Sequence, residues 1–243
     1  MVNRKAWDRY LALLRKCDET ALNLVAKWQE EHPGYASNPN SRRAFVEYCY
    51  AVATKYGEAS AEMACVMYDA LAEASRAGVA AAVPAETATF EQTGIVVNGA
   101  RMQGEAKVPA AVARLVRQAG QDTMLQNAQR DGAEWAWVTT GDTCAFCITL
   151  ASRGWQKQSK RGAKAHAEHI HGNCDCAYVV RFNPNDSGIA GYDPAVARDK
   201  YDNADGNTSQ EKINAMRRES YARHKDEINA QKREAYARRK EDS

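Results

Sequence analysis

Apolar residues in the first 78 positions recur at steps of three and four, and this period limits the fold of the chain more than any other feature. Such a spacing places apolar side chains on one stripe of an α-helix. The first stripe consists of Trp7, Tyr10, Leu11, Leu14, Cys17, Ala21, Leu24 and Trp28. The sequence therefore predicts a first helix that ends at the His-Pro-Gly segment from His32, within an N-terminal helical domain over residues 1–80.

Two more helices are predicted in this domain. The second begins after Asn-Pro-Asn-Ser, with Asn40 or Ser41 as its N-cap, and stops at Gly57. The third continues to Gly78. Because a free cysteine behaves as a small hydrophobic residue, the cysteines on these stripes are interpreted as core residues rather than ligands. They are Cys17, Cys49 and Cys65.

The helical period disappears after the third helix, where alanine, glycine and valine dominate. Residues 81–108 are therefore predicted to be an extended connector that wraps a neighbour or links two bodies. A helix is predicted over residues 110–130, and the alternation of Trp135 and Trp137 predicts a short strand after it. A second strand is predicted in the apolar run that Cys176 opens.

Four of the seven cysteines and one histidine cluster beyond the first strand, as Cys-x-x-Cys followed by His-x-x-Cys-x-Cys. Zinc favours four sulfur or nitrogen ligands in a tetrahedron, and a Cys-x-x-Cys turn commonly supplies two of them. The five candidate ligands are Cys144, Cys147, His171, Cys174 and Cys176. We predict a structural zinc site in which the first four form the leading tetrad and Cys176 is a substitute or a neighbouring thiol.

Other interpretations of this cluster are a disulfide pair and a redox Cys-x-x-Cys. A thioredoxin-like site requires alternating strands and helices, which the chain does not show. His166 and Glu168 begin a zinc deaminase signature, but there the cysteine pair comes after the histidine, whereas here a pair precedes it. His166 and His169 are interpreted as exposed loop residues. The predicted metal is therefore a clamp that pins the loop over residues 151–170 onto two short strands.

Composition and charge exclude several classes of protein. The net charge of +2 offers no argument from the whole chain for a polyanionic partner, and no apolar run is long enough for a membrane span. An odd number of cysteines without a secretion signal argues against a disulfide framework. We expect a soluble protein made in the cytoplasm, with reduced thiols.

A repeat of 15 residues begins at Ile213 and again at Ile228, and it predicts a charged helical tail over residues 209–243, after a loop over residues 184–208. One interpretation is a solvated helix with paired opposite charges. The other is that basic pairs and tyrosines contact phosphates or an acidic partner. These residues are Arg217 with Arg218, Lys232 with Arg233, Arg238 with Arg239, and Tyr221 and Tyr236.

The predicted fold class is mainly α with a small α+β module like a zinc ribbon. A helical bundle at the N-terminus is followed by the extended connector. A helix and short strands then surround the cysteine and histidine cluster over residues 109–183, and the helical tail completes the chain.

The motif region resembles a known family. The run VTTGDTCAFCITLASRG, followed by HGNCDC and an apolar strand, resembles the Mu F-like minor head proteins of tailed phages, in particular those of actinobacterial phages and prophages. The stretch YGEASAEMACVMYDALAEA from Tyr56 is similar to the helical pair that precedes the motif in those proteins. The resemblance covers roughly residues 40–183, and Cys144, Cys147, His171, Cys174 and Cys176 match the motif positions.

The resemblance implies a non-enzymatic minor capsid protein inside the phage head near the portal, acting in head assembly, in genome packaging or ejection, or in both. Its implied partners are the portal protein and the major capsid or scaffold proteins, with phage DNA as a further partner of the basic loop and the tail. Its implied location is the host cytoplasm during assembly and then the virion.

Two other functions remain as alternatives. One is a nucleic-acid-binding zinc module in which a basic loop grips DNA. The basic residues of that loop are Lys157, Lys160, Arg161 and Lys164. The other alternative is an enzyme, either a head-maturation protease or a zinc nuclease. A convincing set of serine, histidine and carboxylate for a protease is not evident in the sequence.

Overall fold

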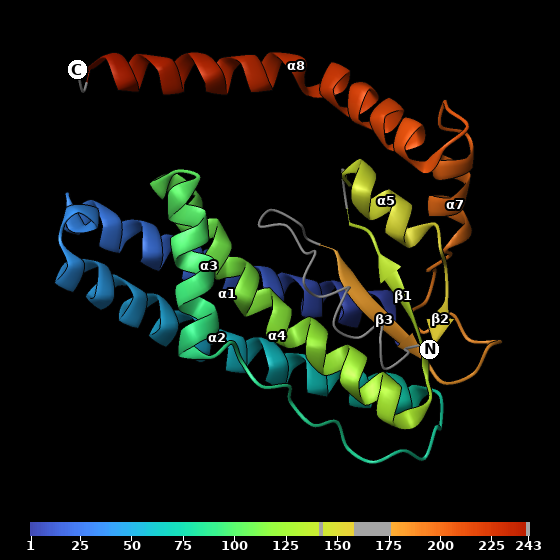
Figure 1. The fold of residues 1–243 in the computed structure, drawn as a ribbon. Helices are drawn as coiled ribbons and strands as arrows, with labels where there is room; N and C mark the ends of the chain where they lie inside the picture. The colour runs from blue at the N-terminus through green and yellow to red at the C-terminus, as the bar shows by residue number, and fades with distance from the viewer. Residues whose placement is uncertain (141–142, 158–175, 242–243) are drawn as a thin grey trace. The chain divides into compact units, whose positions relative to one another are not determined.

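The computed structural model describes residues 1–140, 143–157 and 176–241, which are mainly helical with one small antiparallel sheet (Figure 1). The chain divides into two compact units. The first comprises Met1–Val138 and Trp155–Asp193, and the second comprises Thr139–Gly154 and Pro194–Ser243. The mainly helical fold class is thus confirmed.

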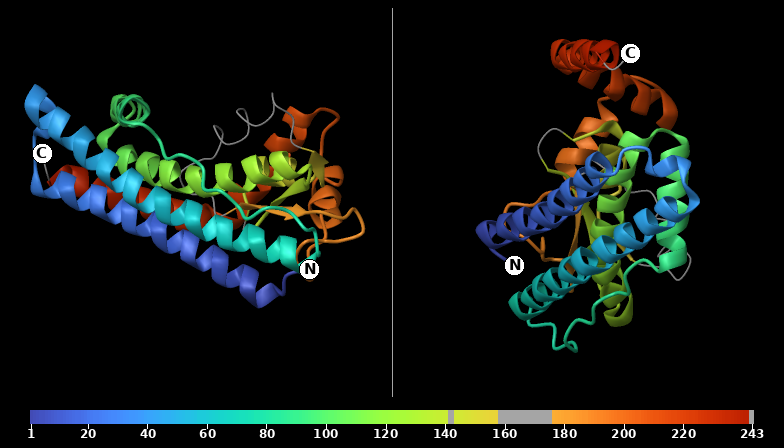
Figure 2. Two further views of the ribbon diagram at one scale, coloured as in Figure 1. Left: turned by 90° about the horizontal axis from the view of Figure 1, so that it is seen from below. Right: turned by 90° about the vertical axis from the view of Figure 1, so that its left-hand side faces the viewer.

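Three long helices lie side by side in the first unit (Figures 1 and 2). They are α1 (Arg4–Glu31), α2 (Pro39–Ala74) and α4 (Val108–Asp131). The predicted first helix is confirmed as α1. Its N-terminus is capped by Asn3, whose side chain accepts a hydrogen bond from the Ala6 N–H at 2.8 Å. The chain leaves α1 at His32, as the His-Pro-Gly segment predicts.

The prediction of separate second and third helices is wrong, because α2 runs through Gly57 without a break. Its N-cap is Asn38, followed by Pro39 in the first turn, and not Asn40 or Ser41. A glycine ends a helix when its backbone turns left-handed, and Gly57 does not. Gly57 serves packing instead: a Cβ placed there would lie 2.9 Å from the Thr87 methyl group.

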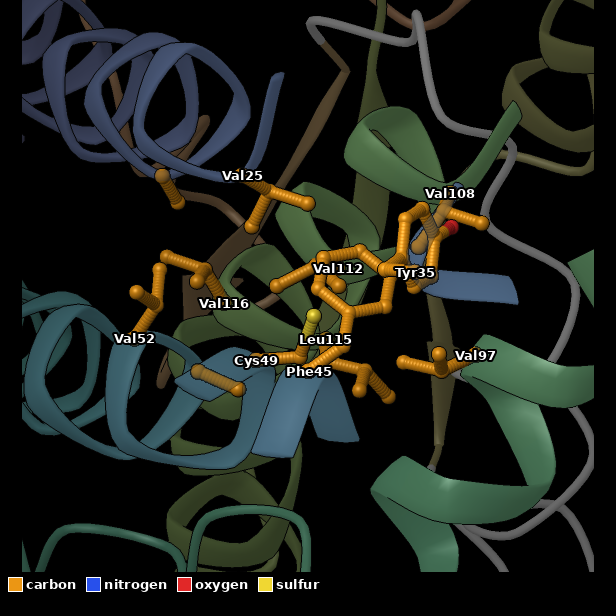
Figure 3. Close-up of a cluster of buried hydrophobic side chains, with 12 residues drawn as sticks. Val25, Tyr35, Phe45, Cys49, Val52, Val97, Val108, Val112, Leu115 and Val116 are labelled. Atoms are coloured by element: carbon orange, nitrogen blue, oxygen red, sulfur yellow. The ribbon is translucent and has the colours of Figure 1, made fainter. Parts of the chain in front are cut away.

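A buried apolar cluster joins the helices of the first unit (Figure 3). It includes Val25 of α1, Phe45 of α2 and Val112 of α4. Cys49 is fully buried in this cluster, and that burial raises the pKa of its thiol to about 12, which confirms it as a core residue. Cys17 packs against the same cluster but is only partly buried.

The third cysteine that was assigned to the core, Cys65, is also only partly buried. Its thiol has a pKa raised by burial first and then by Asp69 and Glu62. The core assignment therefore holds fully for Cys49 alone.

The extended connector predicted for residues 81–108 is wrong for its second half. Residues 77–89, here called the strap, are extended, but Phe90–Met102 form helix α3, and the 3-10 turn Glu105–Lys107 follows. A capping box starts α3: Thr89 Oγ1 accepts from the Gln92 N–H at 3.2 Å, and Gln92 Oε1 accepts from the Thr89 N–H at 2.9 Å. The helix forms although it contains two glycines, Gly94 and Gly99, which have a low helix propensity.

The sheet has the order β2-β1-β3 and is antiparallel throughout. Its strands are β1 (Glu134–Val138), β2 (Gln156–Lys157) and β3 (Ala177–Arg181), so both predicted strands are confirmed. The register pairs Trp137 with Tyr178, and the rings of Trp135 and Trp137 both meet the Tyr178 ring edge to face. The sheet packs against α4.

In the second unit, α5 (Ala145–Ala151) contacts both α7 (Ala195–Asp202) and α8 (Ser209–Glu241). The helical tail is confirmed as α8, whereas the loop predicted over residues 184–208 is wrong where it contains α7. Lys212 stabilises the short helix α7. Its Nζ donates to the carbonyls of Tyr201 (3.1 Å) and Asp202 (2.7 Å), which lie at the C-terminal end of that helix.

At the C-terminal end of α4, Asp131 joins two helices. Its Oδ2 accepts a hydrogen bond from the Tyr68 hydroxyl of α2 at 2.8 Å, and Arg130 donates to both of its oxygens at 2.7 Å. The bonds from Arg130 hold the pKa of Asp131 below its usual value; burial opposes this effect and the Tyr68 bond reinforces it.

This lowered pKa predicts an acid-sensitive contribution to stability. A carboxyl whose pKa is lower in the folded state stabilises the fold above its unfolded pKa of about 4, and that contribution disappears as the pH falls through the folded pKa. Asp131→Asn is therefore expected to lower the free energy of unfolding by about 1–3 kcal/mol at pH 7, with the difference from wild type shrinking below about pH 4.

Urea unfolding between pH 3 and pH 7 measures this effect. Asp8→Asn is the control, because Asp8 pairs with Arg4 on the surface of α1; its effect should stay below about 1 kcal/mol. An Asp131→Asn difference that does not change with pH would contradict the assignment.

Candidate metal site

The Cys-x-x-Cys segment forms the first turn of α5. Cys144 is the N-cap, and its Sγ accepts a hydrogen bond from the Cys147 N–H at 3.5 Å. Cys147 is buried and Cys144 is partly exposed. A cysteine pair with this N–H···S bond suits a metal site, because the amide dipole offsets part of the negative charge that a metal-bound sulfur carries.

The cysteine pair also lies at the N-terminus of a helix, and this position bears on the redox interpretation of the pair. Thioredoxin-like sites share this feature, so the helix does not separate the two interpretations. The antiparallel order of the sheet does, because it confirms that these strands lack a βαβ arrangement.

Cys176 lies directly before β3 and is 4% exposed. Its carbonyl oxygen accepts a hydrogen bond from Gln121 Nε2 of α4 at 2.9 Å. Gln121 is itself buried, at 2% exposure, so α4 fixes the backbone of this candidate ligand. Gln121 was not predicted to belong to the site, and its only signal in the sequence is an amide on the apolar side of a predicted helix.

The five predicted ligands do not all fall within the structure. Cys144 and Cys147 belong to the second unit and Cys176 to the first, whereas His171 and Cys174 lie outside the described residues, as do His166 and His169. Among the residues that are described, no three His, Cys, Asp or Glu side chains form a group that could hold a metal ion. The zinc site and the zinc-ribbon-like module therefore remain predictions.

The tail and the basic loop are described only in part. Arg217, Arg218 and Tyr221 are exposed on the first half of α8. The side chains of Lys232, Tyr236, Arg238 and Arg239 lie outside the description, and so do Lys160, Arg161 and Lys164 of the loop. The two interpretations of the tail therefore both remain open.

The second unit also contains a cleft that no pattern in the sequence predicts. Its volume is about 770 Å³, and α5, α7 and α8 line it. Ile148 and Met216 supply apolar surface there, while Lys200, Arg223 and His224 supply polar groups.

In the described part of the chain, no helix combines the length and the apolar character that crossing a bilayer requires.

Comparison with known proteins identifies a family but no individual relative. The family model of the VG15 protein matches residues 1–204, which include all five candidate ligands and end before α8. Neither a curated protein nor a solved structure matches the chain. Since the family model covers most of the sequence, the chain belongs to the VG15 protein family, a family of viral (phage) gene proteins.

Proposed function

We propose that this phage protein is a minor capsid protein of the Mu F-like type, located inside the head near the portal, where it acts in head assembly and in genome packaging or ejection. The observation that carries the proposal is the joint spacing of CAFC and HGNCDC in a chain of a phage family. The role is structural and requires no catalysis by this chain. The portal protein and the major capsid or scaffold proteins are the proposed partners.

We further propose a structural zinc ion held by Cys144, Cys147, His171 and Cys174, with Cys176 as the alternative ligand. The donor chemistry supports this, since thiolates and imidazole are the ligands that structural zinc favours. Zinc would supply a rigid tetrahedral crosslink. The first turn of α5 presents two of the sulfurs, and Gln121 holds the backbone of Cys176.

Metal analysis tests the zinc site. Protein purified under reducing conditions is expected to contain about one zinc per chain, and Cys147→Ser is expected to lose it and to unfold at a lower temperature. Cys65→Ser is the control, because Cys65 is a partly buried thiol on α2 that is not part of the cysteine and histidine motif. Wild-type protein without zinc, together with unchanged stability in Cys144→Ser, would overturn the site.

A separate experiment tests the role in the particle. Mass spectrometry of purified procapsids and intact virions should detect the protein in few copies, and portal complexes should retain it during purification. Its absence from both kinds of particle would overturn the proposed role while leaving the zinc result unaffected.

For contacts with DNA or an acidic partner, we propose the exposed basic residues of α8, including Arg217 and Arg218, together with the basic loop.

A further inference from the structure

The strap, residues 77–89, is held against helices α2 and α4 of the first unit in an unusual way. None of its residues is buried, although it runs for 13 residues without a helix or strand. Its apolar side chains are small or exposed; Val83, for example, is 57% exposed. Burial of apolar side chains, which joins α1, α2 and α4, therefore contributes little to holding the strap in place.

Polar side chains bind the main chain of the strap instead. Asn127 contacts Val83 twice: its Oδ1 accepts from the Val83 N–H at 2.9 Å, and its Nδ2 donates to the Val83 carbonyl at 2.8 Å. Gln126 Nε2 donates to the same carbonyl at 2.7 Å. Asn127 thus acts as one residue of a neighbouring strand would, pairing with both main-chain groups of a single strap residue.

Further bonds extend this pattern in both directions along the strap. Arg130 donates to the carbonyls of Ala80 at 2.8 Å and Ala81 at 3.0 Å. Thr123 accepts from the Ala85 N–H at 2.9 Å. Because Thr123, Asn127 and Arg130 follow one another at steps of four and three, they form a single polar row on α4.

One further hydrogen bond to the strap comes from α2, and particular backbone or packing features mark the two ends of the strap. Asp69 of α2 accepts from the Ala82 N–H at 2.8 Å. At the entry, Arg76 has a φ of 52°, the one positive value at a non-glycine residue in the described chain, and Gly78 follows with a φ of 64°. At the exit, Thr87 lies against Gly57.

We propose that the strap is a clasp that opens and closes as one unit while α2 and α4 stay folded. Two features support this. The groups that hold the strap are polar, so water can replace each bond when the strap leaves. The buried core of the helices contains no strap residue, and Ala88 at the exit of the strap packs only against its edge, so opening leaves the buried core residues in contact with one another.

Hydrogen exchange of backbone amides, followed residue by residue by NMR, tests the proposal on the full chain. The amides of Ala82, Val83 and Ala85 are expected to exchange at a common opening rate, at least about tenfold faster than the amide of Leu125 in α4. Asn127→Asp removes the donor to Val83 and places a charged oxygen beside its carbonyl. This change should accelerate all three strap amides together by about tenfold.

Ala82 and Ala85 make the test sharp, because their acceptors, Asp69 and Thr123, are unchanged in Asn127→Asp. Asn98→Asp, the same change at an exposed amide on α3, is the matched control and should leave the three rates unchanged. If Asn127→Asp weakens the whole fold, Asp69→Ala provides a second route, since it should accelerate Val83 and Ala85 without touching their acceptors.

Acceleration confined to the amide whose acceptor was changed would overturn the proposal, because each bond would then open alone. Strap amides that exchange as slowly as Leu125 would also overturn it, since the strap would then open only with the helices.

Discussion

Arg117→Met is expected to lower the free energy of unfolding by about 3–5 kcal/mol, because it takes from a buried carboxylate the guanidinium that pairs with it. Arg117 lies on α4, and its Nε donates to Asp18 Oδ2 of α1 at 2.7 Å, while Nη2 donates to the same oxygen. Both side chains are only 8% exposed. Solvent therefore cannot replace the guanidinium without opening the contact between α1 and α4.

Denaturant unfolding with a constant m-value measures this loss. Arg43→Met is the matched control: Arg43 pairs with Glu47 on the surface of α2 at 78% exposure, and its change should cost less than about 1 kcal/mol. The double variant Asp18→Leu with Arg117→Met should recover most of the stability, since neither charge of the buried pair remains. An Arg117→Met loss no greater than that of Arg43→Met would refute the assigned role.

The second large effect is expected at Gly120, in the middle of α4. A Cβ there would lie 2.5 Å from Ser60 Oγ and 3.0 Å from the Ser60 carbonyl oxygen of α2. Rotation can move the hydroxyl, but the carbonyl belongs to the α2 backbone, so the two helices must separate. Gly120→Ala is therefore expected to destabilise the protein by about 2–3 kcal/mol, although alanine is the better helix former by about 1 kcal/mol.

Gly99→Ala provides the opposite expectation from the same substitution. Gly99 is also helical, but no atom lies within 4 Å of its added Cβ, so the change should stabilise α3 by about 0.5–1 kcal/mol. Ser60→Gly in the Gly120→Ala background should restore part of the loss, because it removes the hydroxyl and leaves the carbonyl. Equal signs for the two alanine substitutions in thermal unfolding would show that the helix contact is not the cause.

The candidate metal site shows what the sequence could predict and what it could not. The spacing of cysteines identified the motif, because metal ligands require particular atoms close together in the chain. It did not show that Cys144 would be a helix N-cap, since seven residues of helix are too short for a clear period. Gln121 could not be assigned to Cys176, because the two lie 55 positions apart.

By itself, the sequence determined the features that depend on neighbours along the chain. The apolar period defined α1 and α4, the alternation of Trp135 and Trp137 defined β1, and the charge repeat defined α8. These elements form because each residue's preference is met within a turn or two of its own position.

The tertiary structure alone decided what depends on residues far apart in sequence. Gly57 lies inside α2 rather than ending it, and its missing Cβ leaves room for Thr87 of the strap. Asp18 and Arg117 are charged yet buried because a partner 99 positions away makes burial tolerable. The strap is ordered without secondary structure of its own because a polar row on α4 binds its main chain, and no local pattern in the strap encodes that row.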